Sequence, residues 1–182
     1  MSAPELTKRV IQALNDNGIP YMLVGSFSSN YYGIPRSTED ADFVLQVEPA
    51  RLQALTDRLG PDFVCDPQLS FETNTGTFKC LLLHRDTSFK VELFMLSQDA
   101  HDQERWRRRL RVAALDGQVC LPSPEDVVIT KLRWFRSKDS EDVKDVMGVQ
   151  GNRLDWPYIE SWCAKHGTLG RLAAVREAVP AI

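Results

Sequence analysis

The segment from Leu23 to Leu45 constrains the fold of this chain more than any other part of the sequence. An apolar strand ends in Gly25-Ser26, a loop follows, and Asp40 and Asp42 then open a second apolar strand. Alternate residues of a strand point to the same face, so these two carboxylates lie side by side. Two like charges at that distance are costly unless a cation lies between them. The pattern therefore predicts a site for a hard divalent metal ion beside a loop that can hold phosphate.

The composition is that of an ordinary globular protein. The chain has 182 residues, of which 43% are hydrophobic and 26% charged, which fits one domain or a domain with a small appendage. A net charge of −3 argues against a surface that binds nucleic acid all over. The sequence contains no run of about 18 apolar residues, so we expect no membrane span. The four cysteines lack metal-finger spacing and no secretory signal is evident, so we expect reduced thiols and a cytoplasmic location.

Hydrophobic periodicity predicts a mixed order of elements in the first part of the chain. A capping box at Ser2 and Glu5 begins a helix that should end near Asn17-Gly18. Patterns of period 2 or 3.6 then follow in turn. They predict a strand over 21–24, a short helix over 27–32, a strand over 42–47, a helix over 49–59, and a hairpin of strands over 78–84 and 89–96.

From residue 107 onward, the sequence predicts a hairpin followed by helices. A second hairpin is expected around Asp116-Gly117, with strands over 107–114 and 118–121. Ser123-Pro124 then begins a helix, and further helices are expected over 141–149, from residue 155, and over 169–179. The predicted fold class is α+β, with a mixed β-sheet flanked by helices. We divide the chain into a core over 1–121 and a C-terminal helical subdomain over 122–182.

A family resemblance is carried by the segment from Gly25 to Asp42. The segment reads as a strand, G-[GS], a short helix, G-x-x-R-x-T-x-D-x-D and a second strand. This resembles the signature of the DNA polymerase beta-like nucleotidyltransferase superfamily, in the longer-loop form that is similar to AbiEii-type abortive-infection toxins and their bacterial relatives. The matching positions are Gly25, Ser26, Gly33, Arg36, Thr38, Asp40 and Asp42. The resemblance implies a nucleotidyltransferase-type fold, with Mg²⁺ and a nucleoside triphosphate as its ligands.

The resemblance also implies roles for individual residues. Asp40 and Asp42 are expected to bind Mg²⁺, and Gly25 and Ser26 to contact the triphosphate. We add Arg36 and Thr38 of the signature to the nucleotide-binding set. We also add Lys131, since relatives often carry a lysine on the corresponding helix. Taken alone, Asp40 could be a helix cap or a turn residue, and Asp42 a strand-edge acid paired to Arg36. Arg133, Arg136 and Lys138 are expected to be mostly surface charges.

Glu92 is the candidate for the third carboxylate that the resemblance implies. It is an acid inside the apolar strand over 89–96, where an unpaired carboxylate is unfavourable. The family more often has Asp at this position, so Glu92 departs from the pattern. Its expected role is that of a metal ligand or a base for the acceptor hydroxyl. The alternative is an ion pair with Lys79 or Lys90.

An arginine-rich run covers residues 105–111. If this segment is a strand, Arg107, Arg109 and Arg111 share one face and form a patch for RNA or a phosphorylated acceptor, with Trp106 to stack on a base. The interpretation that we favour is a sheet edge protected by charge, or arginines that are paired with Glu104 and Asp102.

The function expected from these features is that of a Mg²⁺-dependent nucleotidyltransferase. It would move a nucleoside monophosphate to a hydroxyl of tRNA, a protein or a small molecule. The resemblance suggests a toxin or phage-defence role with a possible antitoxin partner. The main alternative is a catalytically weak nucleotide-binding or partner-binding protein on the same fold. A third interpretation is an RNA-binding module that uses the arginine run.

Overall fold

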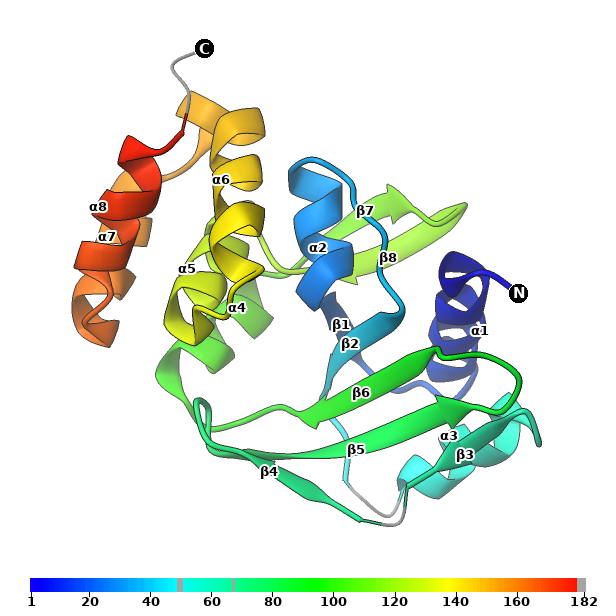
Figure 1. The fold of residues 1–182 in the computed structure, drawn as a ribbon. Coiled ribbons are helices and arrows are strands. Elements are labelled where there is room, and N and C mark those ends of the chain that lie inside the picture. Colours follow the sequence, from blue (N-terminus) through cyan, green and yellow to red (C-terminus); the bar gives the residue numbers. More distant parts are fainter. Residues whose placement is uncertain (49–50, 67, 180–182) are drawn as a thin grey trace.

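The protein is built on one large β-sheet, and its computed structural model describes residues 1–48, 51–66 and 68–179 (Figure 1). The strand order is β1-β2-β6-β5-β3, and β4 pairs with β5. Only the central pair, β2 and β6, is parallel among the strands described. The bounds are β1 (Tyr21–Val24), β2 (Asp40–Leu45), β3 (Phe63–Cys65), β4 (Ser70–Glu72), β5 (Thr77–His84) and β6 (Lys90–Met95).

Two helices, α1 (Ala3–Asp16) and α3 (Leu52–Leu59), pack together against this sheet (Figure 1). The capping box at the start of α1 forms as predicted, because Ser2 and Glu5 each bond to the other's backbone N–H. The apolar stripe of α1 is fully buried at Leu6, Val10 and Leu14. Burial of these side chains against the sheet removes apolar surface from water and holds the sheet rigid from behind.

The site-bearing side of the sheet faces the remaining helices. A second apolar cluster lies there, formed by Met22, Val24, Val44, Phe94 and Trp106. In Figure 1 the C-terminal helices lie above and to the left of the sheet, with α2 between them and β2. The helices are α2 (Gly25–Tyr32), α4 (Ala100–Arg108), α5 (Pro124–Trp134), α6 (Asp139–Gln150), a 3₁₀ turn (Gly151–Arg153), α7 (Trp156–His166) and α8 (Leu169–Glu177).

The arginine run does not form a strand. Residues 100–108 form α4, and the separate two-stranded hairpin of β7 (Leu110–Ala114) and β8 (Gly117–Leu121) begins only at Leu110. Asp99 caps α4 by accepting from two backbone N–H groups, and this local capping starts a helix. Trp106 is 7% exposed, so it packs inside the protein. The strand face of Arg107, Arg109 and Arg111 is therefore wrong, and so is the stacking role for Trp106. The favoured pairing with acids is present, because Arg105 pairs with Asp102 and Arg107 with Glu104.

The predicted fold class is confirmed, with shifts at several element boundaries. Helix α2 begins at Gly25 instead of residue 27, and β2 covers 40–45 instead of 42–47. Of the helix expected over 49–59, residues 49–50 lie outside the described residues and α3 begins at Leu52. The short strands β3 and β4 and helix α4 were not predicted. Within the described residues, no helix combines the length and apolar character needed to cross a membrane.

Candidate active site

The candidate site is built around the point where β1 turns into α2. Gly25 is the first residue of α2 and has φ +63°, in the left-handed region that favours glycine. A Cβ at this position would lie 1.9 Å from Oδ2 of Asp42. Val24 and Asp42 are register partners in the antiparallel β1–β2 pair. Glycine therefore lets the start of α2 lie directly against the Asp42 carboxylate.

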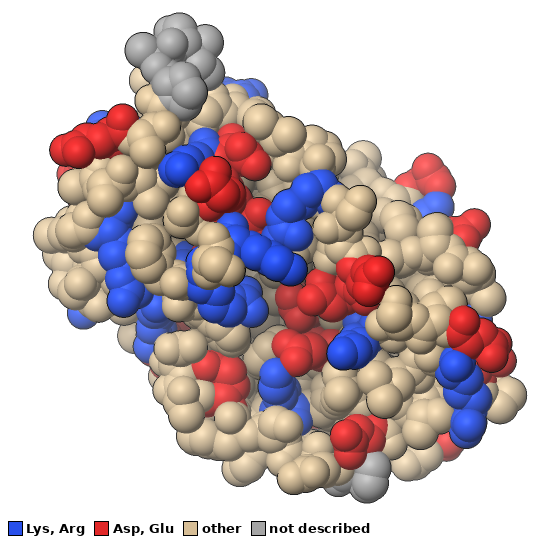
Figure 2. Space-filling view, viewed as in Figure 1, with Lys and Arg blue, Asp and Glu red and all other residues tan. Residues whose placement is uncertain are grey.

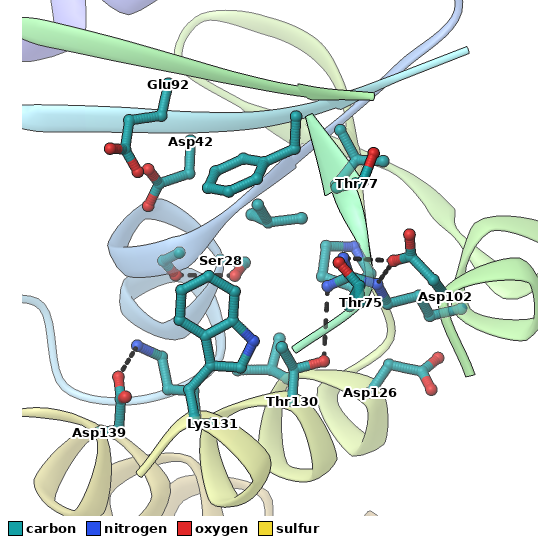
Figure 3. Close-up of a pocket in the computed structure, with 18 of the residues that line it drawn as sticks. Ser28, Asp42, Thr75, Thr77, Glu92, Asp102, Asp126, Thr130, Lys131 and Asp139 are labelled. Carbon is teal, nitrogen blue, oxygen red and sulfur yellow. Dashed lines mark hydrogen bonds and ion pairs between the residues drawn. The ribbon is translucent and has the colours of Figure 1, made fainter. Parts of the chain in front are cut away.

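Two predicted carboxylates meet at the centre of the sheet. Asp42 and Glu92 are register partners on the parallel strands β2 and β6, both are half-buried, and Figure 3 shows their carboxylates close together. Asp40 opens β2 and is exposed, and its Oδ1 accepts a hydrogen bond from the Thr38 hydroxyl. Oε1 of Glu92 accepts from Nζ of Lys79 at 2.5 Å. The Lys79 ion pair that was the alternative for Glu92 is thus present in the structure.

The electrostatics of Asp42 fit a cation-binding site. Burial, together with the negative charges of Glu92 and Asp40, raises the pKa of Asp42 from 3.8 to about 7, against the opposing charges of Arg136 and Lys131. Carboxylate oxygens are the ligands that Mg²⁺ prefers. No three acidic, His or Cys side chains of the described residues stand in a metal-holding arrangement. Asp40 bonds to Thr38 and Glu92 to Lys79, but all three acids offer carboxylate oxygens, so the donor set fits Mg²⁺ in kind.

Arg36 does not pair with Asp42. Its Nε and Nη2 donate to the two carboxylate oxygens of Asp142 in α6, at 2.8 and 3.0 Å, and Nη2 also donates to Oγ of Ser26 at 3.1 Å. The side chain of Asn30 bonds to both the backbone N–H and the carbonyl of Arg36. The hydrogen bonds that Arg36 donates to the Asp142 carboxylate raise the pKa of Arg36. Arg36 therefore ties the signature loop to α2 and to the C-terminal helices.

Lys131 lies on α5 and faces the pocket that holds Asp42 and Glu92. Its Nζ donates to Asp139 at 3.2 Å and to Asp142 at 2.5 Å, and Figure 3 shows the bond to Asp139. The side chain is only 7% exposed, and the two aspartates are 1% and 3% exposed. This is a buried, paired lysine, and two carboxylates neutralise its charge.

Acidic and basic side chains face one another across the middle of the molecule in Figure 2. The pocket there lies between the sheet and α5, and its lining includes Asp42, Glu92, Lys131, Arg136 and Asp139. The sequence patterns missed Asp139, Asp142 and Arg136. The sequence analysis gave neither aspartate a role, and it interpreted Arg136 as surface charge. The only signal that they belong to the site is their place in the folded chain.

The inner end of the pocket is closed by a polar network centred on Asp126, whose carboxylate oxygens are hydrogen-bonded. Asp126, at 0% exposure, accepts from the Ser123 and Tyr158 hydroxyls at 2.9 and 2.8 Å and lies 3.0 Å from Nε2 of His101. His166 on α7 packs beside His101, with ring centroids 5.3 Å apart. Buried polar groups with full partners rigidify a site. This network therefore fixes α4, α5 and α7 relative to one another.

The described site brings together groups of the kinds that bind a phosphate chain and a divalent cation in proteins. It combines two adjacent carboxylates, a glycine at the start of α2 that permits close approach, and basic side chains from α5 and the turn after it. The space between them is lined on the sheet side by apolar residues such as Val44 and Phe94. Low polarity around charged groups strengthens their interactions with a bound ligand.

Comparisons of the fold gave similar solved structures of low sequence identity. ANT(2")-Ia, in complex with adenylyl-2"-tobramycin, aligns with a TM-score of 0.62 and 13% identity over 90% of this chain and 95% of that one. An antigenic nucleotidyltransferase-like protein from Paracoccidioides brasiliensis aligns with a TM-score of 0.54 and 18% identity, over 97% and 94%. The lincosamide antibiotic adenylyltransferase LnuA, lincomycin-bound, aligns with a TM-score of 0.53 and 10% identity, over 80% and 96%.

These likenesses establish the fold, which is that of a nucleotidyltransferase. A sequence search of curated proteins gave no match. A family model matches residues 5–173, which is most of the chain and includes every candidate site residue discussed above. The chain therefore belongs to the family described as "Nucleotidyltransferase of unknown function (DUF6036)".

Proposed function

We propose that this protein transfers a nucleoside monophosphate from a magnesium-bound nucleoside triphosphate to an acceptor hydroxyl. The observation that carries the proposal is the pairing of Asp42 with Glu92 beneath Gly25, at the start of α2. Two half-buried carboxylates in register at the centre of a sheet are unfavourable without a cation. Membership of a nucleotidyltransferase family supports the same chemistry.

We assign the candidate residues to three roles: metal binding, phosphate binding and support of the surrounding structure. Asp42 and Glu92, with Asp40 at the strand entrance, would hold the metal ion, which supplies charge neutralisation for the triphosphate. Gly25 and Ser26 would contact the phosphate chain through the start of α2, where the backbone N–H groups lack partners within the helix. Thr38 orients Asp40 by hydrogen bonding, and Arg36 and Lys131 stabilise the surrounding loops and helices through Asp142.

The proposed reaction is a displacement at the α-phosphorus. The acceptor oxygen forms a bond to that phosphorus, the bond to the bridging oxygen breaks, and pyrophosphate leaves with the electron pair. Glu92 accepts the proton of the acceptor hydroxyl, which makes that oxygen a better nucleophile. The neighbouring ammonium of Lys79 would hold the Glu92 carboxylate in place before the acceptor arrives.

A label-transfer assay tests the proposal. Each nucleoside triphosphate, radiolabelled on the α-phosphate, is incubated with the protein, Mg²⁺ and one acceptor class: tRNA, cell protein, an aminoglycoside or a lincosamide. The two antibiotic classes are included because similar structures are described with adenylyl-tobramycin and with lincomycin. Wild type should transfer label to one class, and Asp42→Ala should lose at least about 100-fold of the activity.

The control is Asp86→Ala, which removes an exposed carboxylate from the turn between β5 and β6 and should retain wild-type activity. Equal activity in wild type and Asp42→Ala would contradict the proposed role of the carboxylates. The outcome also identifies the nucleotide and the acceptor class together.

A second candidate function is nucleotide binding without transfer. The specific observation in its favour is the Lys79–Glu92 ion pair, which occupies the third carboxylate. This candidate predicts that the folded protein binds a magnesium triphosphate in a titration but releases no pyrophosphate with any acceptor. Pyrophosphate release that depends on Asp42 would exclude it. None of the similar structures named above is described as a toxin, so a toxin role and an antitoxin partner stay predictions.

A further inference from the structure

The turn between α5 and α6 brings an arginine to the candidate site. Arg136 lines the same pocket as Asp42 and Glu92, although it follows them by 94 and 44 residues in the sequence. Its side chain is 61% exposed, whereas that of Lys131 is 7% exposed. A ligand that enters the pocket from solvent can therefore reach the Arg136 guanidinium, while Lys131 is enclosed by its two aspartates.

Asp139 holds this arginine in a defined orientation. The Nε and Nη2 atoms of Arg136 donate to the two carboxylate oxygens of Asp139 at 3.0 and 3.3 Å. Asp139 also accepts the backbone N–H of Arg136 at 2.9 Å and is itself 1% exposed. In the part of the chain that the structure describes, Nη1 of Arg136 has no hydrogen-bond partner. One edge of the guanidinium is thus fixed and the other is available.

Trp134 supports the same guanidinium from its flat side. The Arg136 guanidinium carbon lies 5.0 Å from the centroid of the Trp134 ring. Trp134 packs edge-to-face against Phe94, with centroids 6.1 Å apart, and Phe94 is two residues after Glu92 on the same strand face. The contact between the Trp134 and Phe94 rings therefore connects the position of Arg136 to the strand that carries Glu92.

The backbone between these two residues is held in an uncommon conformation. Phe135 has φ +50° and ψ +44°, the left-handed region that a bulky residue seldom adopts. Arg171 of α8 stacks on the Phe135 ring at 4.8 Å and donates Nη1 to the Leu132 and Arg133 carbonyls. Strain of this kind persists only where the surroundings enforce it. Here it ends α5 and reverses the chain so that Trp134 and Arg136 both reach the pocket.

The carboxylates around Arg136 keep its guanidinium positively charged, as the binding of an anionic ligand requires. Burial by itself would lower the pKa of Arg136, but the hydrogen bond to Asp139 and the charges of Asp139, Asp42 and Glu92 raise it. Arg36 differs, because four of its hydrogen bonds go to protein acceptors. Among the arginines of this site, Arg136 combines a fixed position, an available edge and exposure to solvent.

We propose that Arg136 binds the phosphate chain of the nucleotide through its free guanidinium edge, with Asp139 and Trp134 as the residues that position it. This inference rests on the proposed function, since it names a further ligand for the same triphosphate. A guanidinium suits this task because its planar N–H groups match phosphate oxygens. The carboxylates and the arginine then stand on opposite sides of one ligand.

Titration calorimetry tests the role of Arg136. The probes are magnesium tripolyphosphate, which has no base, and the magnesium complexes of ATP, CTP, GTP and UTP. Arg136→Gln should weaken the binding of tripolyphosphate and of the preferred nucleotide by about 10- to 100-fold, because a charge-assisted hydrogen bond is lost. Arg136→Lys should recover only part of the affinity, since an ammonium cannot make both bonds. Lys138→Gln, which removes an exposed charge two residues away, is the matched control and should bind as wild type does.

The outcomes separate this inference from the proposed function. If wild type binds and Arg136→Gln binds equally well, the role of Arg136 is overturned and the proposed function stands. If wild type binds none of the probes, the proposed function fails and this inference fails with it. Melting temperatures of all variants show whether each one is folded, and a misfolded Arg136→Gln is replaced in the comparison by Arg136→Lys. Affinity of Arg136→Lys equal to that of wild type would then count against the bidentate contact.

Discussion

At the scale of single residues, the backbone of Gly25 lies so close to the Asp42 carboxylate that it leaves no room for a side chain. Gly25→Ala would put a methyl group 1.9 Å from an Asp42 oxygen, at a backbone angle that L-residues seldom adopt. We expect a loss of about 2–4 kcal/mol in the free energy of unfolding, from backbone strain together with the steric overlap. Urea denaturation followed by circular dichroism measures it.

Gly18→Ala is the matched control for this prediction. Gly18 has φ +58°, close to the value at Gly25, but an added Cβ would meet nothing within 4 Å. Its loss of stability reports the backbone strain alone, at about 1 kcal/mol. If the two variants lose the same amount, then the contact between Gly25 and Asp42 is not a tight one.

The sequence points to candidate residues whose surroundings are local. Gly25, Asp40 and Asp42 could be proposed as site residues because turn chemistry and strand alternation act over a few positions. The partners of Arg36 and Lys131 could not, because Asp142 is 106 residues from the first and belongs to a helix whose docking depends on the whole fold. For the same reason, Arg136 read as surface charge. The assignment of catalytic roles to these residues stays a prediction.

At the scale of elements, the contact between α4 and α7 makes stability depend on pH. His166 is stacked beside Trp162 and His101, and burial, together with the charges of Arg133 and His101, lowers its pKa from 6.5 to about 4. The unfolded chain binds a proton near pH 6.5, and the folded protein binds it only near pH 4. Acid therefore favours unfolding, and the stabilising contribution is lost as the pH falls from 6.5 to 4.

His166→Phe keeps an aromatic ring but removes this titration. We expect the free energy of unfolding of the variant to fall less steeply than that of wild type between pH 6.5 and pH 4. Urea denaturation at four pH values across this interval gives the two slopes. Parallel slopes would show that His166 binds its proton equally well in the folded and unfolded states.

The elements that were predicted correctly are those with a clear repeat or cap. Helix α1 has its capping box and apolar stripe, and the β5–β6 hairpin has two apolar runs around a polar turn. Strands β3 and β4 have three residues each, too few to show a period of two. Helix α4 was missed because three of its nine residues are arginines and Trp106 is its single buried large apolar side chain, so no apolar stripe follows the N-cap at Asp99.

At the scale of the whole molecule, Gly33 controls the docking of the C-terminal helices on the signature segment. A Cβ on Gly33 would lie 3.0 Å from the backbone N of Val146 and 3.1 Å from the carbonyl carbon of Asp145, both in α6. Gly33→Ala should therefore push α6 away and cost about 1–3 kcal/mol in the free energy of unfolding.

Gly148→Ala is the corresponding control within α6. An added Cβ there meets nothing within 4 Å, and alanine favours a helix interior, so stability should rise by about 0.5–1 kcal/mol. Chemical denaturation of both variants measures the difference. A Gly33→Ala variant as stable as wild type would show that α2 and α6 are not in close contact.

The apolar core runs through both parts of the chain. One cluster of buried side chains includes Leu6 of α1, Phe43 of β2, Ile129 of α5 and Leu172 of α8. The division into residues 1–121 and 122–182 stays a prediction about how the chain is organised. The shared core explains why the site, which takes residues from both parts, has fixed geometry.

The parallel pairing of β2 with β6 has a consequence for the inheritance of this protein. Asp42 and Glu92 are neighbours in space, but 50 residues apart in the chain, and Arg136 comes later still. Mutations in an evolving lineage can therefore remove Glu92 or Arg136, while the signature from Gly25 to Asp42 passes unchanged to descendants. Descent of the motif and descent of the chemistry are separate events, and a relative that keeps the first has not necessarily kept the second.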